Sequence, residues 1–334
     1  MQSASCNCAR RPCRILYTVF RSCPMIWIAF IPVLLWTAGA LFTARAARAF
    51  ELAQVNRLRL AMALALLGGW VTARASWPSN AIVWSWLLIS GGLGLGLGDL
   101  AMMASYRLIG PRVGVLILSC LAVPTTGVAE WLLLGTRLTA REIIWCVGIL
   151  VGVSLAAAPG ARIPAKDRSA LLWGWGFGIV AALTQGTAAT LSRVAYHHAA
   201  ERAVPMDGIT ATAQRMIGGL IFMALVEGVR QARHILLPPV ALAAEISLRS
   251  TSKPRRAWGA LVGATLCGPV LGLSAYQWAL LHVPSALVQA IASLVPVTVI
   301  PLAWVVENDR ADRRGMAGAI IACCFAVLLA LDRR

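Results

Sequence analysis

One carboxylate in this sequence stands inside an apolar stretch, where a charge is costly. Asp99 follows the glycine run of GGLGLGLGDLAMMASYRL and precedes the turn at Gly110-Pro111 by several residues. A carboxylate within a membrane-spanning stretch must be paired, protonated or facing water, so a functional role is the default hypothesis. Asp99 could bind a cationic group of a substrate or carry a coupling proton. The alternative is a structural carboxylate that reaches the interface or hydrogen-bonds a neighbouring helix.

Uncharged polar and aromatic residues in other apolar runs could complete a binding cavity around Asp99. A glutamine side chain offers both donors and acceptors, and three glutamines fall in three runs of the second half of the chain. Single aromatic side chains could supply the walls. The residues expected at the site are therefore Gln185, Gln277, Gln289, Trp36, Tyr106 and Tyr276. Each glutamine could equally tie two helices together, and each aromatic could be packing.

Two further charged residues leave two interpretations open. Glu130 lies near the end of an apolar run, shortly before Gly135, so it could contribute to the site or be an interfacial carboxylate paired with an arginine. Arg215 is the one Lys or Arg expected well inside a run, where it needs a carbonyl or acidic partner. It could be structural or bind an anionic group.

We expect no catalysis, no metal and no cofactor. The histidines lie near the ends of apolar runs, without metal spacing or a partnered Ser or Cys: His197, His198, His234 and His282. The N-terminal cysteines lack both a His and a paired C-x-x-C: Cys6, Cys8, Cys13 and Cys23. The glycine run lacks the Gly-Lys-Ser/Thr ending of a phosphate loop. Any transport would therefore be driven by a substrate or ion gradient.

The composition is typical of a membrane protein. Of 334 residues, 59% are hydrophobic and only 13% charged, and the mean hydropathy is +0.75; a soluble domain has about a quarter charged residues. Apolar runs of about 20 residues recur, each long enough to cross a bilayer core of ~30 Å. The net charge of +17 comes from arginines in the short connections, as the positive-inside effect produces. A nucleic-acid partner is therefore not expected.

An internal repeat orders the apolar runs. The stretch Gly91–Pro124 returns, altered, as Gly263–Pro296, about half a chain length later. Roughly ten spans result, five in each copy, and an odd number makes the second copy enter the membrane from the opposite face. We predict an all-α integral membrane protein of two inverted five-helix repeats. The expected units are a basic, Cys-containing tail (1–23), the first repeat (24–158), a linker (159–169) and the second repeat (170–331).

Several segments resemble one transporter family. The stretches LAVPTTGVAEWLLLGTRLTAREIIWCVGILVGVSL and SLVPVTVIPLAWVVENDRADRRGMAGAIIACCFAVLL resemble the closing helix pair of each EamA repeat, and NRLRLAMALALL and QRMIGGLIFMAL resemble its arginine-led second helix. The resemblance covers about Trp27 to Leu331. It implies the ten-helix drug/metabolite transporter fold with a central cavity between the halves. The glutamate usual after Gly135 is Thr136 here, and Glu307 and Asp309 only approximate its counterpart in the second copy.

These observations predict a secondary transporter of a small organic solute, such as an amino acid, metabolite or drug, that works by alternating access. The alternative is a membrane scaffold or lipid-handling protein without transport, in which Asp99 and the glutamines would be fully paired with other helices. The expected partners are a small-molecule substrate and the lipid bilayer, with proton or ion coupling as an option, and the expected location is a bacterial inner membrane. The family places both termini in the cytoplasm, whereas Lys and Arg are more numerous on the other side. Orientation and oligomeric state are left open.

Overall fold

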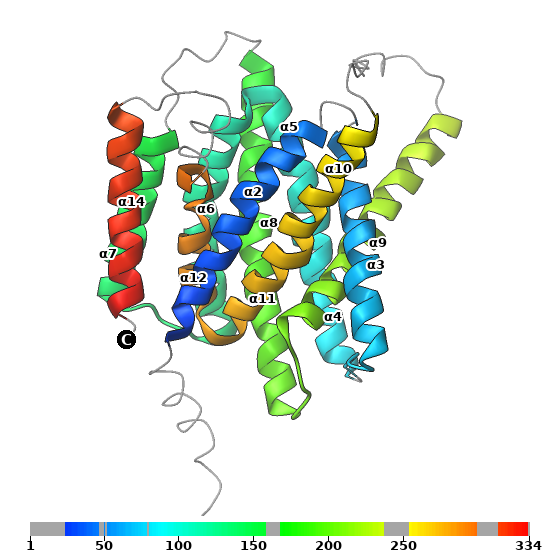
Figure 1. Cartoon of the computed structure of the whole chain (residues 1–334), viewed down its shortest axis with the longest axis horizontal. Helices are drawn as coiled ribbons and strands as arrows, with labels where there is room; N and C mark the ends of the chain where they lie inside the picture. Colours follow the sequence, from blue (N-terminus) through cyan, green and yellow to red (C-terminus); the bar gives the residue numbers. More distant parts are fainter. Residues whose placement is uncertain are drawn as a thin grey trace, which may run out of the picture.

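The structure, a computed structural model, describes residues 24–46, 50, 52–78, 80–157, 168–236, 254–298 and 313–332. Every regular element in this part of the chain is helical (Figure 1). The cysteine-containing tail predicted for residues 1–23 lies outside the described residues, as do Pro301, Glu307 and Asp309.

The first half of the chain forms five helical passes. In order they are η2 (Pro24–Ala29) with α2 (Phe30–Ala46); α3 (Leu52–Ala73); α4 (Ala81–Gly91), η3 (Gly92–Gly98) and α5 (Asp99–Ile109) as one pass; α6 (Pro111–Leu134); and α7 (Ala140–Ala157). Polar and glycine residues set the boundaries. Asn80 caps α4, because its side chain accepts from the backbone amides of Ile82 and Val83. Gly110 and Gly135 take the positive φ angles, 84° and 66°, with which α5 and α6 end.

The second half of the chain repeats this order. Its elements are α8 (Arg168–Glu201); α9 (Gly208–Leu236); α10 (Pro254–Thr265), η4 (Leu266–Gly272) and α11 (Leu273–His282) as one pass; α12 (Ser285–Ala292); and α14 (Arg313–Asp332). Both α8 and α9 are longer than the apolar runs of about 20 residues that the sequence predicts. A hydropathy pattern marks only the apolar part of a helix, whereas these helices continue through polar residues. Among the described residues, six helices are long and apolar enough to cross a membrane.

The third passes of the two halves run in opposite directions. In Figure 1, α4 lies low and α5 high, so the first-half pass rises; α10 lies high and α11 low, so the second-half pass descends. The predicted fold, an all-α bundle of two inverted five-helix repeats, is confirmed.

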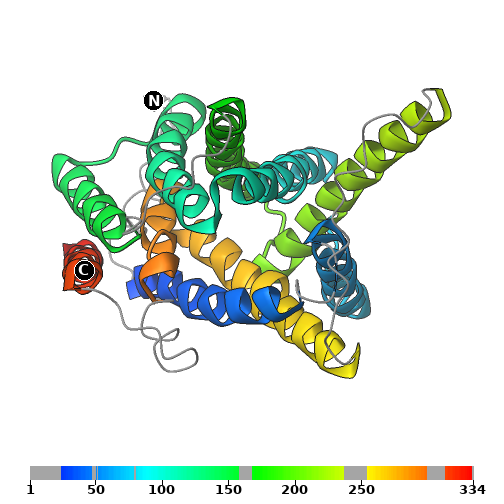
Figure 2. The same cartoon turned by 90° about the horizontal axis from the view of Figure 1, so that it is seen from above.

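The two halves exchange packing partners. The first pass of each half lies against the third pass of the other, α2 on α10 and η4, and α8 on α4, η3 and α5. The second passes do the same, α3 on η4 and α9 on η3, and α3 and α9 also contact each other. At the edge of the bundle, α7 packs against α14 (Figure 2). Side chains from both halves therefore meet at the centre of the molecule.

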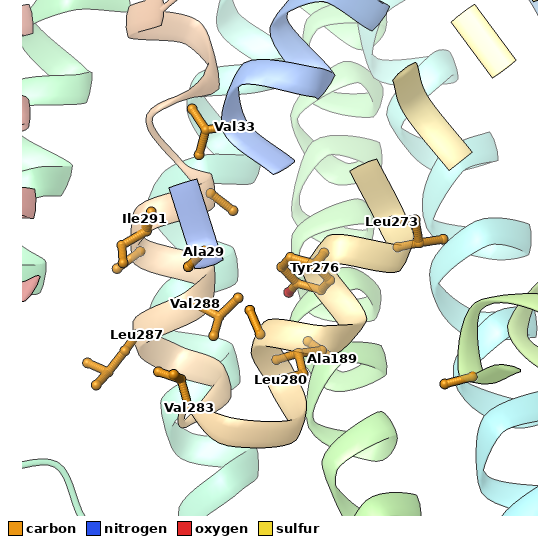
Figure 3. Close-up of a cluster of buried hydrophobic side chains, with 14 of the residues drawn as sticks. Ala29, Val33, Ala189, Leu273, Tyr276, Leu280, Val283, Leu287, Val288 and Ile291 are labelled. Atoms are coloured by element: carbon orange, nitrogen blue, oxygen red, sulfur yellow. The ribbon is translucent and has the colours of Figure 1, made fainter. Parts of the chain in front are cut away.

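The apolar core gathers around α11 and α12. Figure 3 shows side chains from these two helices with residues of the first pass and of α8: Ala29, Val33, Ala189, Leu273, Tyr276, Leu280, Val283, Leu287, Val288 and Ile291. Small residues let helices approach closely, as membrane helices require in the absence of a strong hydrophobic drive. At the crossing of α7 and α14, for example, a Cβ on Gly152 would lie 2.4 Å from the backbone nitrogen of Ala322.

Both third passes contain a seven-residue π-helical segment at their middle, η3 (Gly92–Gly98) and η4 (Leu266–Gly272). Such segments are rare and occur often at functional sites, since the wider turn displaces the residues that follow it. The glycine run indicated a flexible or tightly packed helix but did not predict this geometry. Because η3 ends at Gly98, Asp99 is the first residue after the π-helical turn.

Candidate functional site

Asp99 and Gln185 meet at the centre of the bundle. The Gln185 Nε2 group donates to Asp99 Oδ1 at 3.0 Å and to the carbonyl oxygen of Gly94 at 3.3 Å. Both side chains are partly accessible although they lie between helices of the two halves. Asn56 of α3 lies beside Asp99 without regular hydrogen-bond geometry. The structure thus brings together two of the residues that the sequence indicated, one from each half.

Two arginines approach the same carboxylate from equivalent positions in the two halves. Arg215 of α9 is 2% exposed, and its Nη2 would lie 3.0 Å from a Cβ on Gly94 of η3. Arg59 of α3 has its Nη2 3.1 Å from the position of a Cβ on Gly268 of η4. Each guanidinium group therefore rests on the π-helical segment of the opposite half. Both interact electrostatically with Asp99.

These five side chains define the central polar cluster: Asn56, Arg59, Asp99, Gln185 and Arg215. Several of its atoms have no hydrogen-bond partner among the described residues, namely Nε and Nη1 of Arg215, Nε of Arg59 and both amide atoms of Asn56. Arg59 Nη1 donates to Thr43 Oγ1 at 3.4 Å. Within the described residues, neither arginine lies within 4.0 Å of the Asp99 carboxylate oxygens. The cluster thus holds two cationic groups, one anionic group and free hydrogen-bonding capacity.

A tyrosine–glutamine network lies on the η4 and α11 side. Tyr196 donates to Gln277 Oε1 at 2.8 Å, and Tyr276 donates to Gln289 Oε1 at 2.6 Å. The Trp36 ring packs against Tyr276 with centroids 5.2 Å apart. Tyr196 and Tyr276 both interact electrostatically with Arg215. Four of the predicted site residues therefore gather in one network next to the central polar cluster.

Tyr106 lies on α5, two helical turns after Asp99, so both residues share one face of that helix. Its ring packs against Gly114 of α6, where a Cβ would come within 2.5 Å of the ring. Tyr106 also interacts electrostatically with Asp99. Its position is consistent with both interpretations made from the sequence, a site wall and packing.

Glu130 lies away from the central polar cluster and joins three helices. It is 2% exposed. Its Oε1 lies 3.1 Å from Nε of Arg193, and its Oε2 accepts from the backbone amide and hydroxyl of Ser285 at 2.7 and 2.5 Å. The carboxylate thus links α6 to α8 and caps the start of α12. Glu130 therefore lies as the second interpretation of the sequence predicts, as a carboxylate paired with an arginine.

The sequence interpretation missed two arginines inside helical passes. It expected Arg215 alone well inside a run, whereas Arg59 and Arg193 also lie within helices, α3 and α8. In the sequence, both arginines stand next to apolar runs and resemble residues of the connections. The helical spacing of Arg57 and Arg59 carried a usable signal, since neighbours two positions apart face different sides of a helix. Arg57 faces Glu227 of α9 at 3.7 Å.

A groove lined by described residues lies away from Asp99. It has a volume of about 460 Å³ and lies between α3 and α9, lined mainly by apolar side chains, with Arg57 and Glu227 at its charged end. Arg57 is 45% exposed. The groove therefore lies on the outer side of α3, on a different face from Arg59.

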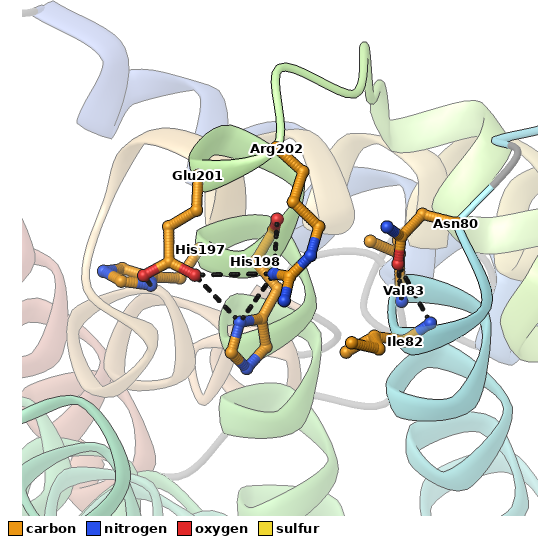
Figure 4. Close-up of polar contacts among 7 residues, drawn as sticks. All are labelled: Asn80, Ile82, Val83, His197, His198, Glu201 and Arg202. Atoms are coloured by element: carbon orange, nitrogen blue, oxygen red, sulfur yellow. Dashed lines mark hydrogen bonds and ion pairs between the residues drawn. The ribbon is translucent and has the colours of Figure 1, made fainter.

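The end of α8 carries a second polar group (Figure 4). Glu201 contacts His197 and His198 at 3.3 and 3.0 Å, and this is the metal-compatible trio within the described residues. Arg202 Nη1 lies 3.5 Å from the same carboxylate and 3.3 Å from His198 Nδ1, where it would oppose a bound cation. The hydrogen bond with His198 lowers the pKa of the Glu201 carboxyl. We interpret the group as a solvated helix end.

Comparison with known proteins identifies the family. A search of curated protein sequences gave no match. A solved crystal structure of another protein shares the fold, with a TM-score of 0.67 at 18% identity, over 93% of this chain and 98% of the matched chain. The sequence model of the EamA-like transporter family matches residues 24–158 and again residues 172–331. The chain therefore belongs to the EamA-like transporter family, whose members are integral membrane transporters.

Proposed function

We propose that this protein is a gradient-driven transporter of a small organic solute, with the central polar cluster as its binding site. The supporting observation is that Asp99, Gln185, Arg59 and Arg215 meet between the two halves, beside both π-helical segments. Ionisable side chains inside membrane helices are rare and mark substrate or ion pathways. The proposal includes a location in a bacterial inner membrane, with residues 24–158 and 170–331 as the two moving halves.

The packing of the two halves suggests how access would alternate. Each first pass lies on the third pass of the other half, so a rocking of one half against the other moves η3 and η4 relative to their partners. A site whose groups come from both halves would then open to one side of the membrane at a time. Asp99 would bind a proton or a polar group of the solute, and Gln185 would hold the carboxylate in place.

The alternative of a scaffold without transport requires that buried polar groups be fully paired. Arg215, Asn56 and Gln277 each have buried polar atoms without a hydrogen-bond partner among the described residues. Such atoms are costly unless a ligand or water satisfies them. This observation supports the transporter.

Replacing Asp99 by Asn tests the proposal. Purified protein is reconstituted in vesicles that contain a pH-sensitive dye, and amino acids, nucleosides, organic anions and cationic drugs are added across an imposed proton gradient. We expect solute-dependent proton movement or solute accumulation with the wild type and its loss in Asp99→Asn, because the amide cannot change charge. The control is Glu227→Gln, which alters a carboxylate of the outer groove and should leave transport intact. Unchanged transport in a folded Asp99→Asn protein would remove Asp99 from the mechanism.

A further inference from the structure

The charges of the central polar cluster indicate which class of solute fits it. We infer that the transported solute carries an anionic carboxylate or phosphate group, bound jointly by Arg59 and Arg215. This inference rests on the proposed function and adds the substrate class to it. Its basis is the pair of arginines, one from each half, that lie near Asp99 in the structure.

The central polar cluster carries one positive charge in excess. The cluster contains two guanidinium groups and one carboxylate, and Arg193 and Glu130 neutralise each other elsewhere. An uncompensated charge inside a membrane protein is strongly unfavourable. One anionic group on a solute would make the cluster neutral. A cationic solute would instead add a third positive charge beside Asp99.

Both arginines have hydrogen-bond donors that are free among the described residues. Nε and Nη1 of Arg215 and Nε of Arg59 have no hydrogen-bond partner in the described part of the chain. A guanidinium group presents its donors in a planar fork that matches the two oxygens of a carboxylate or phosphate. Asp99 does not use these donors, because its oxygens lie beyond ion-pair distance from both arginines among the described residues.

The two guanidinium groups lie against the two π-helical segments, η3 and η4. A Cβ on Gly94 would lie 3.0 Å from Nη2 of Arg215, and a Cβ on Gly268 would lie 3.1 Å from Nη2 of Arg59. The glycines thus make room for the two side chains, one on η3 and one on η4. Since Arg59 belongs to the first half and Arg215 to the second, one anionic group could contact both halves at once. Binding would then favour a particular arrangement of the halves.

The experiment measures anion binding to the purified full-length protein in detergent. Inorganic phosphate, pyruvate and choline chloride are titrated separately at constant ionic strength, with sodium chloride as the reference, and thermal unfolding is followed. A ligand that binds the native state raises the melting temperature with dose. We expect phosphate or pyruvate, and not choline, to raise it; separate titrations show which oxyanion the site prefers. If neither raises it above the chloride reference, the inference is wrong.

Variants then locate the binding. Arg59→Gln and Arg215→Gln should each weaken the apparent anion affinity at least tenfold, whereas Arg57→Gln, on the outer face of the same helix, should not change it. Asp99→Asn should strengthen anion binding several-fold, because it removes the negative charge of the cluster. Loss of anion binding in Asp99→Asn would overturn the inference. Should Arg215→Gln fail to fold, Arg215→Lys keeps the charge but lacks the fork, and weakened binding is again expected.

The vesicle assay separates this inference from the proposed function. Anion binding that depends on both arginines, without any uptake into vesicles, would contradict the transporter and leave the anion site standing. Uptake of choline or of another cation that needs Asp99 but neither arginine would contradict the anion site and leave the transporter standing.

Discussion

At the scale of single residues, Glu130 and Asp99 illustrate two uses of a carboxylate in one bundle. Glu130 forms an ion pair with Arg193 through Oε1, and its Oε2 accepts from the start of α12, which is how a structural charge is kept in an apolar setting. Asp99 accepts a hydrogen bond from Gln185, with Asn56 beside it and two arginines at longer range. The charge of Glu130 is neutralised by its paired arginine, whereas the cluster around Asp99 has one positive charge in excess and hydrogen-bond donors without a partner among the described residues.

The stabilising role of Glu130 is testable with a single substitution. Glu130→Gln removes the charge that neutralises Arg193, whose side chain is 20% exposed. Breaking a buried ion pair costs about 3–5 kcal/mol, and we expect roughly 3 kcal/mol here because Arg193 keeps some access to solvent. Thermal unfolding in detergent should therefore show a drop of several degrees.

Glu227→Gln is the matched control for this experiment, since its ion pair with Arg57 is more exposed and such pairs contribute only about 0–1 kcal/mol. The double variant Glu130→Gln with Arg193→Gln should recover part of the loss, because no unpaired charge remains. Equal melting temperatures for the Glu130 and Glu227 variants would contradict the role given to Glu130.

Residue types alone led to part of the candidate site. Polar and aromatic residues are rare in apolar runs, so the sequence itself points to those that occur there. These residues are Asp99, Gln185, Gln277, Gln289, Tyr276 and Trp36. Arg59 was not visible, because an arginine close to Arg57 reads as part of a basic connection. Only the packing of α3 against η4 shows that Arg59 faces inward while Arg57 faces the outer groove.

At the scale of elements, glycines decide how closely the second and third passes approach. A Cβ on Gly218 of α9 would lie 2.1 Å from the carbonyl oxygen of Leu88, and one on Gly91 would lie 1.9 Å from that of Arg215. The backbones of α9 and α4 are thus in direct contact, which no larger residue permits. The position of Arg215 over η3 depends on this contact.

Gly218→Ala should consequently push α9 away from α4. Overpacking of this kind costs about 1–3 kcal/mol, and we expect a lower melting temperature together with weaker anion binding, because the Arg215 guanidinium moves with its helix. Gly228→Ala is the control on the same helix, since nothing lies within 4 Å of its added Cβ. A Gly218→Ala protein that matches Gly228→Ala in both measurements would show that α9 can shift without consequence.

The sequence predicted helices but not their local distortions. Apolar runs and the Asn80 cap mark where α4 begins, and Gly110 marks where α5 ends, so the pass as a whole was predictable. The π-helical turns of η3 and η4 depend on backbone hydrogen bonds that shift by one residue, and no residue pattern fixes that shift. The full lengths of α8 and α9 could not be predicted for a related reason, because polar residues continue a helix as readily as they end one.

At the scale of the whole molecule, the inverted repeat was predictable because it leaves a period in the sequence. The spacing of Gly91–Pro124 and Gly263–Pro296 and the odd number of passes per copy led to opposite directions of the third passes, which the structure confirms. The exchange of packing partners between the halves did not follow from the period. It depends on which helix faces complement each other, and that information resides in three-dimensional contacts.

The same exchange gives a direct test of alternating access. Gly39 of α2 lies next to η4 of the other half, and a Cβ on Gly39 would be 3.5 Å from the Cβ of Cys267, within the range of about 3.5–4.5 Å that a disulfide requires. Cys267 is a free cysteine. Oxidising a Gly39→Cys protein with membrane-permeant copper phenanthroline should therefore join the two halves in this arrangement, as peptide mass spectrometry can verify.

A bond between α2 and η4 should stop transport, because the two halves can no longer rock against each other. Dithiothreitol should restore the activity within the same vesicles, which separates cross-linking from damage. The control adds Cys267→Ser to Gly39→Cys, so that the same oxidation leaves transport unaffected. If fully cross-linked protein transported solute at the rate of the reduced protein, the movement of α2 against η4 would not be part of the cycle. The access change would then have to come from other contacts between the halves, such as that of α8 with η3.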